Sequence, residues 1–256
     1  MGAGHGLGDS LYRPGTSRVH RLAPECKLAA TVLFVFAVVS TPREQMWAYA
    51  LHAGIVVAVA RMAHVPVTYL VRRLVVELPF VAFAFLLPIV GRGERTHVLG
   101  VSLSVSGLWG AWNILAKGTL GVAASVLLAS TTPVASLLSG LERLRVPRVL
   151  VAICGFMIRY ADVISGEMQR MRVARESRGH NPRWIWQARA VASSAGALFI
   201  RSYERGERVY LAMASRGYTG QLPDVAAPDR DERRWAVALA APVVAALVSA
   251  AAWWSR

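Results

Sequence analysis

Five long apolar stretches constrain this chain more than any other feature. They are Leu28–Ser40, Met46–Ala63, Leu74–Val90, Gly107–Thr131 and Trp235–Trp254. A helix needs about 20 largely apolar residues to cross the hydrocarbon core of a membrane, and helices are one of only two structures that satisfy their backbone polar groups there. We therefore predict an all-α polytopic membrane protein with about five transmembrane helices, the first of them short.

The charge balance supports the same class of protein. Hydrophobic residues make up 55% of the 256 residues, yet the net charge is +14 and almost all of the excess is arginine. A soluble chain this basic would suggest a nucleic-acid partner. In a chain this apolar, basic residues instead indicate cytoplasmic loops, so the lipid bilayer is the expected partner and nucleic acid is not.

Arginines in the connections between the apolar stretches predict the orientation. The first 27 residues and the connection around Arg61 and Arg72 are basic, whereas the turns at 41–45 and 91–97 carry a more balanced charge. Basic loops stay on the cytoplasmic side. The predicted organisation is a cytoplasmic segment at 1–27, membrane helices 1–4 at 28–131, a cytoplasmic coupling-helix domain at 132–234 and a final membrane helix at 235–256.

The segment 132–234 has helical periodicity and strong positive charge. Between residues 168 and 216, ten arginines face three glutamates, a net charge of +7. The ten apolar residues at 149–158 are too few to span a bilayer, and we expect them to form the buried start of a helix lying against the membrane domain. A second amphipathic helix is predicted from about residue 184 to 215, after the break at Asn181-Pro182.

Lys117 interrupts the fourth apolar stretch. An ionisable residue inside a membrane segment is a candidate for function. The alternative is that it marks a junction where the helix bends or tilts against a polar neighbour.

Motifs for catalysis and metal binding are missing from the sequence. No Gly-x-x-x-x-Gly-Lys-Ser/Thr loop precedes a helix, so any ATP hydrolysis belongs to another chain. The histidines lack the spacing of metal ligands, and no protease or serine hydrolase signature is present. We expect a non-catalytic protein without a metal site or cofactor of its own; the histidines are His5, His20, His52, His64, His97 and His180.

Two helical runs end with the same three residues. The first ends in Ser177-Arg178-Gly179 and the second in Ser215-Arg216-Gly217. Glycine commonly follows the last turn of a helix, and an arginine there also favours the helix dipole, so a single copy would be a generic cap. Two copies at amphipathic helix ends predict docking sites, because the guanidinium offers a planar fork of donors to partner carboxylates or carbonyls.

These residues resemble the transmembrane T component of energy-coupling-factor (ECF) transporters, in particular its CbiQ branch. That family carries two Ala-Arg-Gly-like motifs at the ends of its coupling helices. The similarity covers about residues 17–220 and extends to three further blocks: 17–28 before the first membrane helix, Thr131-Thr132-Pro133 after the fourth, and 198–218 leading into the second motif. Ser177 and Ser215 stand where the family usually has alanine.

The resemblance implies a transport function. It implies a coupling subunit of an ABC-type importer in the inner (plasma) membrane, which transmits ATPase motion to a separate substrate-binding S component. Its CbiQ-like character implies cobalt or nickel uptake, a CbiM-like S component and a link to cobalamin biosynthesis. The six motif residues would contact two ABC-type ATPases. The alternatives are a T component for a vitamin, an integral membrane lipid-modifying enzyme, and a channel or self-contained carrier.

Overall fold

The computed structural model describes residues 11–91, 95–98, 101–179, 188–219 and 232–255. The chain divides into two compact units, which are described separately below. The larger unit comprises Leu11–Leu144 and Asp229–Arg256, and the smaller contains Arg145–Pro228 together with Met1–Ser10.

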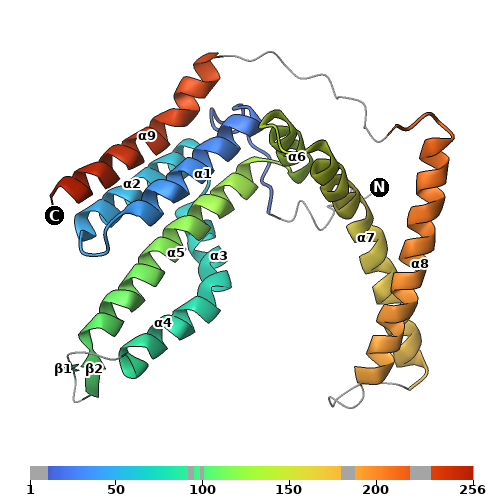
Figure 1. Cartoon of the computed structure of the whole chain (residues 1–256), viewed down its shortest axis with the longest axis horizontal. Coiled ribbons are helices and arrows are strands. Elements are labelled where there is room, and N and C mark those ends of the chain that lie inside the picture. Colours follow the sequence, from blue (N-terminus) through green and yellow to red (C-terminus); the bar gives the residue numbers. More distant parts are fainter. Residues whose placement is uncertain (1–10, 92–94, 99–100, 180–187, 220–231, 256) are drawn as a thin grey trace. The chain divides into compact units, whose positions relative to one another are not determined.

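The larger unit is a helical bundle that contains all five of the predicted apolar stretches (Figure 1). Its elements are α1 (Pro24–Ser40), α2 (Met46–Met62), α3 (Val67–Arg73), the 3₁₀ turn η2 (Leu74–Glu77), α4 (Leu78–Val90), α5 (Val105–Thr131), α6 (Val134–Arg143) and α9 (Glu232–Trp254). Two short strands, β1 (Arg95–Val98) and β2 (Val101–Ser104), pair antiparallel between α4 and α5 with Arg95 opposite Ser104. The helical membrane class predicted from the sequence is confirmed.

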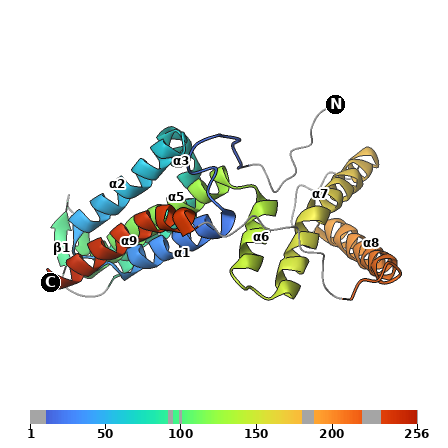
Figure 2. The ribbon, with the colours of Figure 1, turned by 90° about the horizontal axis from the view of Figure 1, so that it is seen from above.

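Packing in this unit is organised by two helices. Both α5 and α9 contact α1 and α2, and Figure 2 shows α9 running alongside α1. The apolar core between them includes Phe34, Val56 and Leu120, with Ala245 of α9 completely buried. Small residues such as Ala245 let α9 approach its neighbours closely, as is common in membrane helix packing. α4 packs on α5, and Leu87 and Pro88 of α4 lie against Gly107 near the start of α5.

Four helices among the described residues are long and apolar enough to cross a membrane. They are Val67–Val90, Val105–Thr131, Arg148–Ser177 and Trp235–Trp254. α1 and α2 have 17 residues each, which at about 1.5 Å per residue gives roughly 25 Å, slightly less than the hydrocarbon core. α5 runs unbroken through Lys117, so the charge within the fourth apolar stretch does not end the helix.

The smaller unit is an antiparallel pair of long helices, α7 (Arg148–Ser177) and α8 (Ala188–Ala214) (Figure 1). Two side-chain contacts join them: Arg205 donates to the Glu167 carboxylate, and Arg175 Nη1 lies 2.6 Å from Ser194 Oγ. The pairing of 167 with 205 and of 175 with 194 fixes the antiparallel register.

The start of α7 is exposed within the smaller unit. No residue of α7 is buried, and Val149, Leu150 and Ile153 are at least half exposed. The predicted packing of this stretch against the membrane domain stays a prediction, because the two units are described separately. The stretch 149–158 also does not stand alone, because the helix continues to Ser177 and qualifies by length and composition as a candidate span. The length of the apolar run alone therefore underestimates the length of the helix.

Candidate ATPase-coupling site

The first Ser-Arg-Gly motif forms the end of α7. Arg178 is the C-cap residue, and its backbone N–H donates to the Arg175 carbonyl at 3.1 Å. Gly179 has φ +76° and its N–H donates to the Glu176 carbonyl at 3.0 Å. A left-handed glycine at this position is the usual way in which a helix satisfies its last carbonyls. The predicted role of Gly179 as a helix-ending glycine is confirmed.

The second motif ends α8 in the same way. Gly217 has φ +82°, its N–H donates to the Ala214 carbonyl at 3.0 Å, and the next N–H, of Tyr218, donates to Met213 at 3.0 Å. These two bonds make the complete Schellman motif. Because only glycine adopts this backbone without strain, the third residue of each motif determines where the helix stops and hence the position of the preceding arginine.

The two serines also have equivalent environments. The Ser177 hydroxyl donates to the Ala174 carbonyl at 3.0 Å, and the Ser215 hydroxyl donates to the Ala212 carbonyl at 3.0 Å. Each serine therefore satisfies its hydroxyl within its own helix and presents little more polar character than the alanine usual in the family. Replacement of alanine by serine is compatible with the same helix end at both motifs.

Arg178 and Arg216 are exposed in the structure. Neither guanidinium contacts a side chain within the described part of the chain, in contrast to Arg172, which pairs with Glu176 at 2.8 Å. An arginine held by its backbone at a helix end, with its fork of donors in solvent, is free to bind a partner's carboxylate or carbonyl. The sequence predicted where these two arginines lie. The structure adds that each arginine directly precedes a glycine with left-handed backbone at the end of its helix.

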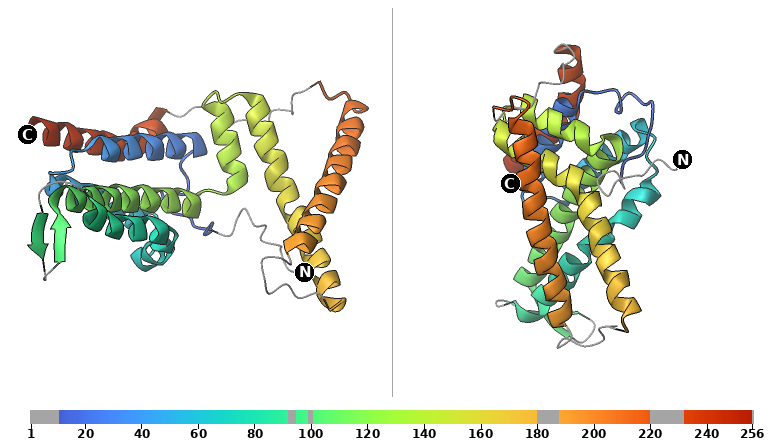
Figure 3. Two further views of the ribbon diagram at one scale, coloured as in Figure 1. Left: turned by 60° about the horizontal axis from the view of Figure 1, so that its bottom comes forward. Right: turned by 90° about the vertical axis from the view of Figure 1, so that its right-hand side faces the viewer.

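The motifs lie at opposite ends of the α7–α8 pair (Figure 3). The two helices are antiparallel, and each motif follows the C-terminus of its own helix. A helix of 27 to 30 residues is about 40–45 Å long, so the motifs are separated by a distance of that order. This separation provides two spaced contact points and no single composite pocket.

The candidate ionisable site at Lys117 is a helix cap. Lys117 Nζ donates to the Val39 carbonyl at 2.7 Å, at the C-terminal end of α1.

Sequence reasoning did not single out Lys27, whose Nζ donates to the Thr131 carbonyl at 2.9 Å, at the end of α5. It also missed the ion pair of Arg143 with the buried Glu25, at 3.0 Å, which fastens α6 to α1. None of these pairs has a local sequence signal, since the partners are about 80 to 120 residues apart.

The described residues contain no group of three or more His, Cys, Asp or Glu side chains that could hold a metal ion. Two of the histidines have structural hydrogen bonds: His20 with Ser17 at 2.7 Å, and His52 with the Ala48 carbonyl. His5 and His180 lie outside the described residues.

Comparison with known proteins identifies the family. The model of the family described as "Cobalt transport protein", CbiQ, matches residues 15–225, which is most of the chain and includes both Ser-Arg-Gly motifs. The chain belongs to the CbiQ cobalt transport protein family. This CbiQ-family chain is accordingly a T component of the ECF type, as its sequence resemblance indicated.

Individual relatives carry matching names. An energy-coupling factor transporter transmembrane protein EcfT of Thermosediminibacter oceani is 27% identical over 226 residues, covering 82% of this chain and 83% of the relative. A cobalt transport protein CbiQ of Rhodobacter capsulatus is 32% identical over 124 residues, 48% of this chain and 50% of the relative. A putative fused cobalt transport protein CbiMQ of Methanocorpusculum labreanum is 30% identical over 143 residues, 54% of this chain and 24% of the relative.

Proposed function

We propose that this CbiQ-family chain is the coupling subunit of an ABC-type importer in the plasma membrane. In this proposal, two ATPase subunits bind the α7–α8 pair through Ser177-Arg178-Gly179 and Ser215-Arg216-Gly217, and their motion is passed to a CbiM-like substrate-binding subunit. The cargo is cobalt or nickel, and the chain itself has no catalytic role. The observation that carries the proposal is the duplicated helix end, with the same backbone geometry and an exposed arginine in both copies.

The spacing of the motifs supports a pair of ATPases. Two contacts tens of ångströms apart on one rigid helix pair suit two subunits that approach and separate, because each motif can follow its own subunit. A binding surface for one partner would favour contiguous contacts instead. The Glu167–Arg205 and Arg175–Ser194 contacts link the helices between the motifs, so displacement of one end would be transmitted to the other.

The proposed cargo rests on the family and relatives. The CbiQ model and the fused CbiMQ relative favour cobalt, while relatives named EcfT cover more of this chain and leave a vitamin as the alternative cargo. Uptake of radioactive cobalt and nickel by cells expressing the complete gene cluster would separate these cases. Uptake of neither metal, with uptake of a vitamin, would refute the metal assignment and leave the coupling proposal intact.

Alanine substitution of the two arginines tests the coupling role. A charge-assisted hydrogen bond lost from a desolvated contact costs about 1.5–3 kcal/mol, or roughly 10- to 100-fold in affinity. Arg178→Ala and Arg216→Ala should therefore weaken ATPase binding by that factor, reduce cargo uptake sharply, and leave the amount of protein in the membrane unchanged. Arg→Lys should rescue only in part, because lysine lacks the planar fork.

The matched control is Arg208→Ala, which removes another exposed arginine of α8 outside both motifs. It should bind the ATPases and support uptake like the wild type. If all three alanine variants lose ATPase binding equally, the α7–α8 pair contributes only general positive charge. If Arg178→Ala and Arg216→Ala both transport normally, the coupling assignment is wrong.

A further inference from the structure

A half-open cavity of about 500 Å³ lies in the larger unit, called the membrane unit below, and the coupling motifs do not account for it. It is lined by residues 27–34 of α1, 55–62 of α2, 124–131 of α5 and 237–244 of α9, together with part of the segment before α1. Its volume is within the range of about 300–1,000 Å³ typical of small-molecule sites.

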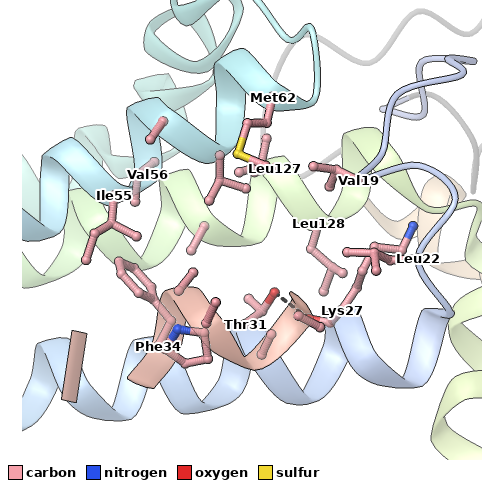
Figure 4. Close-up of a pocket in the computed structure, with 18 of the residues that line it drawn as sticks. Val19, Leu22, Lys27, Thr31, Phe34, Ile55, Val56, Met62, Leu127 and Leu128 are labelled. Carbon is pink, nitrogen blue, oxygen red and sulfur yellow. Dashed lines mark hydrogen bonds between the residues drawn. The ribbon is translucent and has the colours of Figure 1, made fainter. Parts of the chain in front are cut away.

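The cavity arises from how the four helices pack. α1 and α2 each contact α5 and α9, while the facing positions of these helices carry small side chains such as Ala30, Ala124 and Ala241. Alanines do not reach across the space that larger residues would fill. Figure 4 shows the surrounding labelled side chains, with Phe34 and Ile55 at one end and Leu22 and Lys27 at the other.

One end of the cavity is cationic and the rest is apolar. Among the residues that the structure describes, Arg18 and Lys27 are the only charged side chains that line it. Lys27 is 7% exposed and bonds the neutral Thr131 carbonyl rather than a carboxylate. The nearest acid along the chain, Glu25, is already paired with Arg143 at 3.0 Å. An occupant with an anionic head and a hydrocarbon tail therefore complements both ends.

The position along the helices is consistent with such an occupant. The cavity touches the start of α1, the end of α2, the end of α5 and the start of α9. These four ends are the cytoplasmic ones in the orientation predicted from the arginine distribution. A headgroup at Arg18 and Lys27 would then lie at the inner membrane surface, where anionic lipids attract basic residues.

Other occupants fit less well. A metal cation of the proposed cargo would be repelled by Arg18 and Lys27 and would meet no carboxylate among the described residues that line the cavity. A helix is about 10 Å wide, so one 5.4 Å turn occupies roughly 400 Å³, and the cavity has room for little more than a single turn of a partner's helix. A flexible acyl chain does not need a space as wide as a helix.

We propose that this cavity binds one acyl chain of an anionic phospholipid from the inner leaflet, with its phosphate at Arg18 and Lys27. The site is independent of the proposed coupling function, because the residues involved lie outside both Ser-Arg-Gly motifs. Bound lipid would fill the space between α1, α2, α5 and α9 and stabilise their packing.

The test is native mass spectrometry of the purified full chain in detergent, titrated with dioleoyl phosphatidylglycerol or with zwitterionic dioleoyl phosphatidylcholine. One phosphatidylglycerol should remain bound under conditions that remove phosphatidylcholine. Each basic residue near an anionic lipid contributes about 1 kcal/mol, so Arg18→Gln should weaken phosphatidylglycerol binding about fivefold and leave phosphatidylcholine binding unchanged. Arg43→Gln removes an exposed base at the other end of α1 and is the charge control.

A second variant tests the acyl-chain part of the site. Ala30→Leu combined with Ala241→Leu narrows the cavity and should reduce binding of both lipids, whereas Ala53→Leu, an exposed position of α2 outside the cavity, should not. Size-exclusion chromatography and thermal unfolding check that the filled variant folds, and Arg18→Gln tests the headgroup contact without altering the core.

Three outcomes would overturn the proposal. Absence of a stoichiometric lipid on the wild type, or equal lipid retention by all variants, would mean only ordinary annular lipid. Displacement of the lipid by inorganic phosphate alone would indicate a simple anion site. Crosslinking of a cysteine at Ala30 to the substrate-binding subunit, with no lipid bound, would assign the cavity to a partner protein.

Discussion

Lys27 and Lys117, the only lysines in the chain, cap the C-termini of each other's helices. Lys27 of α1 donates to the Thr131 carbonyl, the last residue of α5, while Lys117 of α5 donates to the Val39 carbonyl, near the end of α1. The last carbonyls of a helix have no partner within it, and a cation there also favours the helix dipole. The two lysines therefore fix how far α1 and α5 overlap.

Removal of the Lys117 amine should destabilise the membrane unit. Lys117→Met keeps the apolar stem but leaves the end of α1 with one donor fewer, and we expect a loss of about 1–2 kcal/mol in the free energy of unfolding. Thermal unfolding in detergent measures it. Ser125→Ala is the control, because Ser125 is an exposed residue of α5 that bonds only its own helix, at Gly121. Equal stability of the two variants would contradict the capping role.

Substitution of the motif glycines should disturb the coupling site without removing an arginine. Gly217→Ala forces a side chain into a backbone with φ +82°, at a cost of roughly 1–2 kcal/mol. The end of α8 should unwind or extend, and Arg216 should lose its position. ATPase binding should fall as for Arg216→Ala, while Gly206→Ala, within α8 and with open space around it, should bind normally or be slightly more helical.

The ion pair between Glu25 and Arg143 should hold α6 against α1. Glu25 is 8% exposed, so Arg143→Met leaves a buried carboxylate without its cation, and we expect a loss of about 2–3 kcal/mol in unfolding free energy. Glu25→Gln in the same background should recover part of it. By contrast, Arg43→Met breaks the exposed pair with Glu44 at 4.0 Å and should change stability by about 0.5 kcal/mol or less. Equal losses of unfolding free energy in Arg143→Met and Arg43→Met would show that burial of the Glu25–Arg143 pair does not affect stability.

Cysteine labelling tests the orientation and the status of α7 together. In a background without Cys26 and Cys154, a membrane-impermeant maleimide applied to intact cells should label Glu44→Cys in the α1–α2 turn. It should label Arg61→Cys, at the end of α2, and Arg189→Cys, at the start of α8, only after permeabilisation, since both positions are predicted to be cytoplasmic. Labelling of Arg189→Cys from outside would mean that α7 crosses the membrane, as its length and composition allow. Labelling of Arg61→Cys from outside would reverse the whole topology.

The sequence by itself determined the class of protein and the ends of α7 and α8. Hydrophobic length is a local property, so the five apolar stretches predicted the long apolar helices of the larger unit. The motif glycines were equally local signals, because a left-handed residue after a helical run is a requirement of the backbone alone. Because each arginine directly precedes its motif glycine, the glycines also predicted that Arg178 and Arg216 lie at the helix ends.

Tertiary structure decided what the buried polar residues do. From the sequence, Lys117 was either a functional charge or a junction where the helix bends or tilts against a polar neighbour, and only the packing of α5 on α1 shows that it bonds the end of another helix. Lys27, Glu25 and Arg143 gave no signal, since their partners lie about 80 to 120 residues away along the chain. The cavity between α1, α2, α5 and α9 likewise has no sequence pattern, because it depends on which alanines four separate helices turn toward one another.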